Sequence, residues 1–107
     1  MFQLKKDNSV WWPVTICEPN DGGGVVEHKC QAKFEIVTQD EFDSLAEGGD
    51  RNLIKKLLKG WKEIADPEGH DLAFSEENIT ALLQFPYVRA SFLNSYMQAA
   101  AGAPIKN

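Results

Sequence analysis

The sequence predicts a single α+β domain, in which an N-terminal antiparallel β-hairpin or small sheet packs against three to four α-helices. Apolar residues alternate with polar ones up to about residue 37 and then recur with a period near 3.6 residues. The chain of 107 residues has the length of one domain, so residues 1–107 are expected to form one unit. The hairpin should span about residues 10–37, and a helix-rich C-terminal two thirds should span about 39–102.

The N-terminal third has the composition of two strands joined by a tight turn. Residues 11–17 are aromatic and β-branched, and Pro13 favours an edge strand. The glycine-rich stretch 19–24 predicts a hairpin turn. Alternation along both strands places one set of side chains on the buried face: Trp12, Val14, Ile16, Val26, His28, Cys30, Ala32, Phe34 and Ile36.

Two helices are expected after the hairpin. Thr38 and Glu41 have the spacing of a capping box, which predicts a short helix that ends at the glycines 48 and 49. Asp50 is expected to cap a longer second helix that runs to Ile64. Its apolar stripe would consist of Leu53, Ile54, Leu57, Leu58, Trp61 and Ile64.

Two further helices are expected after a turn at residues 66–70. Ser75 is expected to cap the third helix, which should stop before Pro86. Pro86 suits the first turn of a final helix, Tyr87 to Ala101, closed by Gly102. Residues 103–107 are expected to form a loose tail.

Composition and charge exclude several classes of protein. The net charge of −5 disfavours general nucleic-acid binding, because the phosphate backbone is itself negative. The chain has no run of about 20 apolar residues and no apolar N-terminal signal, so neither membrane insertion nor export is expected. The two cysteines, Cys17 and Cys30, fit a reducing compartment and are expected in or near the core. We therefore expect a cytoplasmic protein.

No motif in the sequence favours catalysis. His28 and Cys30 share a strand face, but Cys17 and the distant His70 are the only further His or Cys ligands for a metal. A thiol among apolar neighbours keeps a raised pKa and is a weak nucleophile. The loop at 22–24 precedes a strand and lacks the lysine of a phosphate-binding loop. We therefore expect a protein that is not an enzyme, with no cofactor and no metal.

Two features favour binding to a partner. The predicted second helix carries a basic face that includes Lys55, Lys56, Lys59 and Lys62, which is suited to an acidic partner or is simply solvated. The final helix carries a broad apolar stripe, which is either central to the core or a surface for a partner or for self-association. That stripe comprises Val88, Phe92, Leu93, Tyr96 and Met97. Trp11 points away from Trp12 and is a candidate anchor on the sheet.

An ordered set of short segments covers nearly the whole chain. These segments are Trp11-Trp12-Pro13-Val14, Gly60-Trp61, Asp66-Pro67-Glu68-Gly69, Phe74-Ser75-Glu76-Glu77-Asn78, Leu82-Leu83 and Pro86-Tyr87-Val88-Arg89. As a set they resemble the tail assembly chaperones of long-tailed bacteriophages and prophages, in their short form.

The resemblance implies a protein that binds the long, helical tape measure protein in the host bacterial cytoplasm. It would keep that partner soluble until tail tube subunits polymerise around it, and it would be absent from the mature virion. In many such phages a longer form made by ribosomal frameshifting is thought to recruit the tail tube protein. The family has no transferable binding motif, so the candidate residues are those nominated above from their chemistry.

Two other functions compete with this interpretation. The first is a structural tail completion or head-tail connector protein that stays in the virion. The second is a small acidic inhibitor that mimics nucleic acid, although the acidic residues are not gathered in one block.

Overall fold

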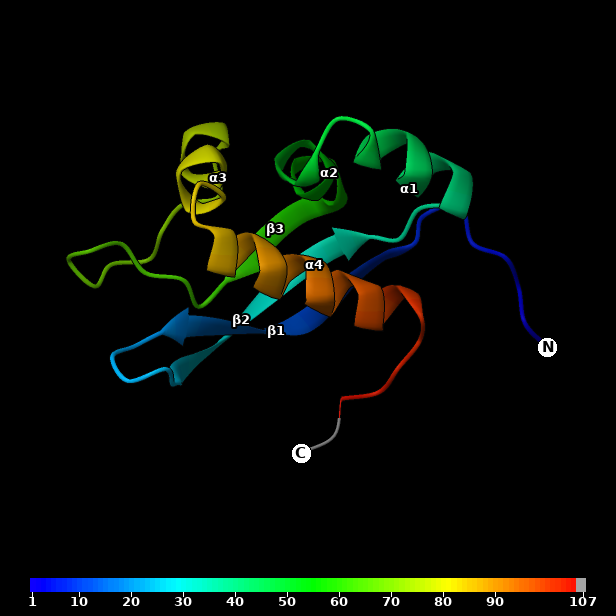
Figure 1. Cartoon of the computed structure of the whole chain (residues 1–107). Coiled ribbons are helices and arrows are strands. Elements are labelled where there is room, and N and C mark those ends of the chain that lie inside the picture. Colours follow the sequence, from blue (N-terminus) through cyan, green and yellow to red (C-terminus); the bar gives the residue numbers. More distant parts are fainter. Residues whose placement is uncertain (106–107) are drawn as a thin grey trace.

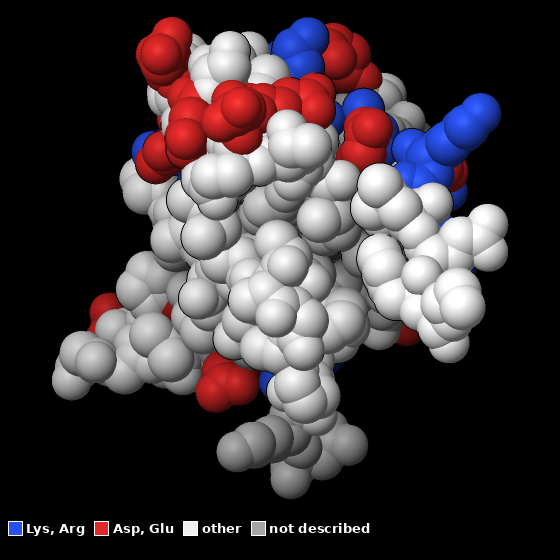
Figure 2. All heavy atoms as spheres, turned by 90° about the vertical axis from the view of Figure 1, so that its right-hand side faces the viewer, with Lys and Arg blue, Asp and Glu red and all other residues white. Residues whose placement is uncertain are grey.

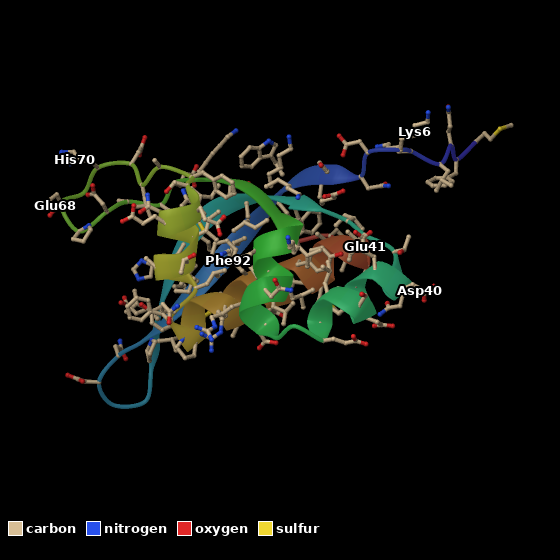
Figure 3. The ribbon with its side chains drawn as sticks, turned by 90° about the horizontal axis from the view of Figure 1, so that it is seen from above. Lys6, Asp40, Glu41, Glu68, His70 and Phe92 are labelled. Carbon is tan, nitrogen blue, oxygen red and sulfur yellow. The ribbon has the colours of Figure 1, made fainter. Side chains whose placement is uncertain are left out.

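The computed structural model describes residues 1–105, in which one antiparallel sheet and four helices form two layers. Figure 1 shows α4 crossing one face of the sheet, with α1, α2 and α3 in a row beside it, and Figure 3 shows all four helices on that side. The elements are β1 (Ser9–Pro19), β2 (Val25–Glu35), α1 (Gln39–Ala46), α2 (Asp50–Leu57), β3 (Leu58–Lys62), α3 (Glu76–Leu82) and α4 (Pro86–Ala100). The predicted α+β class is confirmed.

The N-terminal hairpin is confirmed, and its second strand lies at the centre of the sheet. The strand order is β1-β2-β3, so Pro13 lies on an edge strand as predicted. Val14, Cys30, Ala32 and Phe34 are buried. Val26 and His28 were expected inside but are exposed, because the end of the hairpin near the turn extends beyond the core.

Local caps set the helix starts. The Thr38 hydroxyl accepts a hydrogen bond from the Glu41 amide over 3.2 Å, and the Ser75 hydroxyl accepts one from the Asn78 amide over 3.2 Å. Both predicted caps are therefore confirmed. Asp50 was expected to cap α2 but is its first helical residue, because Gly49, at a φ of 91°, takes the capping position.

The second helix is shorter than the sequence predicts. It ends at Leu57, and the chain continues directly into β3, which pairs with residues 31–34 of β2. Gly60 costs about 1 kcal/mol inside a helix relative to alanine, whereas strand pairing still buries Leu58 and Trp61. Residues 58–75 contain no α-helix, so the C-terminal two thirds is less helix-rich than expected.

Residues 63–75 form a loop that projects from the sheet. Asp66 Oδ1 accepts hydrogen bonds from the amides of Glu68 and His70, each over 2.9 Å, which confirms the predicted turn. Figure 3 shows Glu68 and His70 at the tip of this loop. The returning chain is held by Trp61, whose indole nitrogen donates to the Leu72 carbonyl over 2.7 Å.

Helix α4 supplies the centre of the core and covers one edge of the sheet. Phe92 is fully buried between the two layers (Figure 3), and Tyr96 packs edge-on against Phe34 with ring centroids 5.6 Å apart. The Cys17 amide on β1 donates to the Ser91 hydroxyl over 3.2 Å. Helix α4 therefore satisfies a backbone donor that an edge strand would otherwise expose.

The C-terminal residues were expected to be a loose tail. Residues 103–105 are exposed and have no regular secondary structure, while residues 106 and 107 lie outside the described part of the chain. Within residues 1–105, no helix combines the length and the apolar character needed to cross a membrane.

Substitution of Phe92 tests whether the α4 stripe belongs to the core. Phe92→Ala should lower the free energy of unfolding by about 3–5 kcal/mol, because it leaves a cavity at a fully buried position. Met97→Ala on the same helix is the matched control and should change it by less than about 0.5 kcal/mol, since Met97 is half exposed. Urea denaturation followed by circular dichroism measures both, and equal effects would contradict this packing.

Candidate partner-binding surface

The structure separates the apolar residues nominated on α4 into core and surface groups. Val88, Phe92 and Tyr96 are 3%, 0% and 2% exposed, so they pack in the core and do not form an exposed stripe. Of the two alternatives expected for this stripe, a place in the core is therefore the one that applies to these three residues. They follow one another at four-residue intervals and fill the space against the sheet, which is the physical reason for their spacing.

Leu93 and Met97 remain at the surface of α4. Together with Asp50, Pro86 and Arg89, they line an open hollow of about 470 Å³. Met97 is 50% exposed and Leu93 is partly buried. This apolar surface is smaller than the five-residue stripe expected from the sequence.

The nominated lysines do not form one helix face. Lys55 and Lys56 lie on α2, whereas Lys59 and Lys62 lie on β3, because the helix ends at Leu57. The Lys55 ammonium pairs with the Glu76 carboxylate of α3 and donates to the Thr80 hydroxyl over 3.2 Å. Lys55 therefore joins two helices, and the predicted basic helix face is wrong.

The uncovered face of the sheet brings Trp11 together with basic residues. Trp11 of β1 is paired in register with Lys33 of β2, and Lys33 is paired with Gly60 of β3, so the three residues lie in one row across the sheet. A Cβ atom on Gly60 would lie 3.3 Å from the Trp11 ring. The indole ring therefore lies directly over Gly60. Any residue with a side chain at position 60 would bring its Cβ atom closer to the ring than an ordinary van der Waals contact.

Lys62 lies two residues after Gly60 on β3 and also contacts Trp11. Its ammonium lies 4.1 Å from the centroid of the Trp11 ring, within the range of a cation–π contact. The Trp11 side chain is 41% exposed, so the ring still presents apolar area to solvent. We call Trp11, Lys33, Gly60 and Lys62 the Trp11 platform.

Lysine residues gather around Trp11, although the protein as a whole is acidic. Lys59 lies on the same face, where its ammonium is 3.3 Å from the Glu35 carboxylate. The acidic residues of α1, by contrast, gather at one end of the molecule, where Figure 2 shows red side chains along the upper edge and Figure 3 labels Asp40 and Glu41. The face therefore suits a partner segment with apolar and acidic side chains.

Sequence reasoning nominated Trp11, Lys59 and Lys62 but missed two members of the surface. Lys33 was not among the nominated residues, and Gly60 falls within the helix that the sequence predicts from Asp50 to Ile64. The register of the hairpin places Lys33 opposite Trp11, and a strand prediction for residues 58–62 would have added Gly60 to the same row.

The two cysteines differ from the expectation that both lie in or near the core. Cys17 is exposed, whereas Cys30 is buried, and burial raises the pKa of the Cys30 thiol to about 11. His28 is 3.0 Å from the Glu18 carboxylate at the exposed end of the hairpin. Within residues 1–105, no three His, Cys, Asp or Glu side chains are grouped so that they could hold a metal ion.

No protein-family model, curated protein sequence or solved structure matches the chain.

Thiol labelling tests the different environments of the two cysteines. At pH 8 a disulfide reagent should modify Cys17 quickly, whereas Cys30 should react at least about 100-fold more slowly, because only about one Cys30 thiol in a thousand is ionised. Absorbance of the released thiolate measures both rates. The Cys17→Ser variant is the control and should show only the slow reaction until denaturant is added; fast labelling of that variant would contradict the buried position of Cys30.

Proposed function

We propose that this protein is a tail assembly chaperone of a long-tailed phage or prophage. It binds the tape measure protein in the host cytoplasm and keeps it soluble until tail tube subunits assemble. The observation that carries the proposal is the Trp11 platform, a partly exposed aromatic ring among lysines on a sheet face without helices. A holdase needs this kind of adhesive surface and requires no reacting group.

The chemistry of the Trp11 platform suits a long helical partner. The flat indole contributes apolar contact area at small entropic cost, and aromatic residues are common among the residues that dominate binding energy. Lys33 and Lys62 beside it would pair with acidic residues on the partner and would set its orientation. Because Lys62 is exposed, binding should weaken as salt rises.

Several of the segments that support the family resemblance contact one another on the two faces of the sheet. The Trp11 ring lies over Gly60, and the neighbouring Trp61 contacts the ring of Phe74 with centroids 4.9 Å apart. Arg89 at the start of α4 donates to the Leu83 carbonyl at the end of α3 over 2.9 Å. Residues that are far apart in the sequence thus support one another around the sheet.

Two further parts of the proposal concern the assembly cycle. A longer form made by frameshifting would carry an added C-terminal domain for the tail tube protein. The chaperone would leave before the particle is complete. A tail completion or head-tail connector protein would instead remain in the virion.

Co-expression with the tape measure protein encoded downstream in the same genome tests the proposal. The unaltered chain should keep that partner soluble and co-purify with it. The double variant Trp11→Ala, Lys62→Glu should lower the co-purified amount about tenfold, because it removes the aromatic anchor and reverses a charge. Lys56→Glu is the matched control: it alters an exposed lysine on α2 and should leave the yield unchanged.

Three outcomes would redirect the proposal. Loss of rescue in Met97→Asp but not in the double variant would move the binding surface to α4. Rescue that fails for every form, together with the chain being found in purified particles, would favour the connector function. Rescue that the double variant leaves intact would remove the role of the Trp11 platform.

A further inference from the structure

The sheet has an unfilled edge beside its central strand. Strand β2 covers residues 25–35, but β3 pairs only with residues 31–34 of it. The chain then leaves the sheet at Glu63, whose φ of 67° is unusual for a residue other than glycine. The part of β2 nearest the hairpin turn therefore has β1 on one side and no strand on the other.

The backbone groups on this edge face outward in pairs. The Ile36 amide donates to the Asn8 carbonyl, and bonding alternates along an antiparallel ladder, so the backbone groups of even-numbered β2 residues face β1. Those of Glu27 and Lys29 consequently face the empty side. Among the described residues, no hydrogen bond reaches the backbone of either one there. An added antiparallel strand could therefore form paired backbone hydrogen bonds with both Glu27 and Lys29.

A cavity of about 590 Å³ opens beside this edge on the helix side of the sheet. Its apolar wall is formed by Ile16, Ile64, Leu82, Tyr87 and Val88, and His28 lies on its strand side. On an added strand, the residue opposite His28 would point toward the helices, as His28 does, and would enter this cavity. The volume is enough for one large apolar side chain.

The charged residues around the cavity indicate which side chains a bound segment should carry next to its apolar residue. Glu63 lines the cavity, and its carboxylate has no ion pair within residues 1–105. Glu27 is 3.7 Å from the Lys29 ammonium, and Glu18 is close to His28. The carboxylate of Glu63 at the position where β3 ends is therefore available to a basic residue at the N-terminal end of an added strand.

We propose that the free edge of β2 binds an extended, basic peptide segment of another protein as an additional antiparallel strand. The segment makes backbone hydrogen bonds to Glu27 and Lys29, inserts a large apolar side chain into the cavity and places a basic side chain beside Glu63. This is strand addition, in which backbone bonds supply affinity and alternate side chains supply specificity. It is independent of the chaperone proposal, because the Trp11 platform lies on the opposite face of the sheet.

A synthetic peptide designed for this edge tests the inference with the whole chain. The probe is acetyl-Arg-Thr-Phe-Lys-Val-Thr-amide. Its arginine would meet Glu63, its phenylalanine would enter the cavity and its lysine would lie opposite Glu27. The matched control carries N-methyl groups on its first threonine and its lysine, the two residues that would bond to β2. Amide spectra of the isotope-labelled chain measure binding residue by residue.

The intact peptide should produce saturable shifts of the Glu27 and Lys29 amides, and the N-methylated peptide should bind at least about tenfold more weakly, since it loses the ladder bonds. Glu63→Gln should weaken the intact peptide about threefold, as expected for an exposed ion pair. Three results would overturn the inference: no shifts at millimolar peptide, equal binding of the N-methylated peptide, or shifts centred on Trp11. Self-association of the free chain with Glu27 and Lys29 protected would assign the edge to a second copy instead.

Discussion

The pairing of the short strand β3 with β2 is the interaction on which the rest of the structure depends. It places Trp61 in the core and Gly60 beneath Trp11 on the opposite face. It also brings Lys62 to the indole ring, and its end at Glu63 leaves the remaining edge of β2 free. A helix that continued through these residues would remove both the Trp11 platform and the unfilled edge.

All four helices lie on one side of the sheet, and this arrangement determines which apolar residues of α4 are buried in the core. Because no helix packs on the other side, the single core must be filled from α4 and α2 against the inner face of the strands. Phe92 and Tyr96 are therefore core residues, and Ser91 covers the edge of β1. The uncovered face is left to polar and basic side chains around Trp11.

Charge is distributed unevenly over the two ends and faces of the molecule. Although the net charge is −5, Lys33 and Lys62 lie together beside Trp11, whereas Lys59 is paired with Glu35 and acidic residues gather at α1. An acidic average composition disfavours general binding to nucleic acid, but it is compatible with local attraction for an acidic segment. The two proposed surfaces accordingly select partners of opposite charge, acidic at Trp11 and basic at Glu63.

The sequence by itself determined the hairpin and three of the four helix starts, because these depend on local interactions. The caps at Thr38 and Ser75, the proline at the start of α4 and the glycine turn each act within a few residues. Only the tertiary structure decided the conformation of residues 58–62. Leu58 and Trp61 fit an apolar helix stripe, and both are buried in the strand because the register shifts between Lys33 and Phe34. The choice follows from the pairing partner that β2 supplies, and pairing between segments about thirty residues apart leaves no local pattern in the sequence. The same contact decided which nominated residues lie at the surface, because burial depends on what covers a side chain.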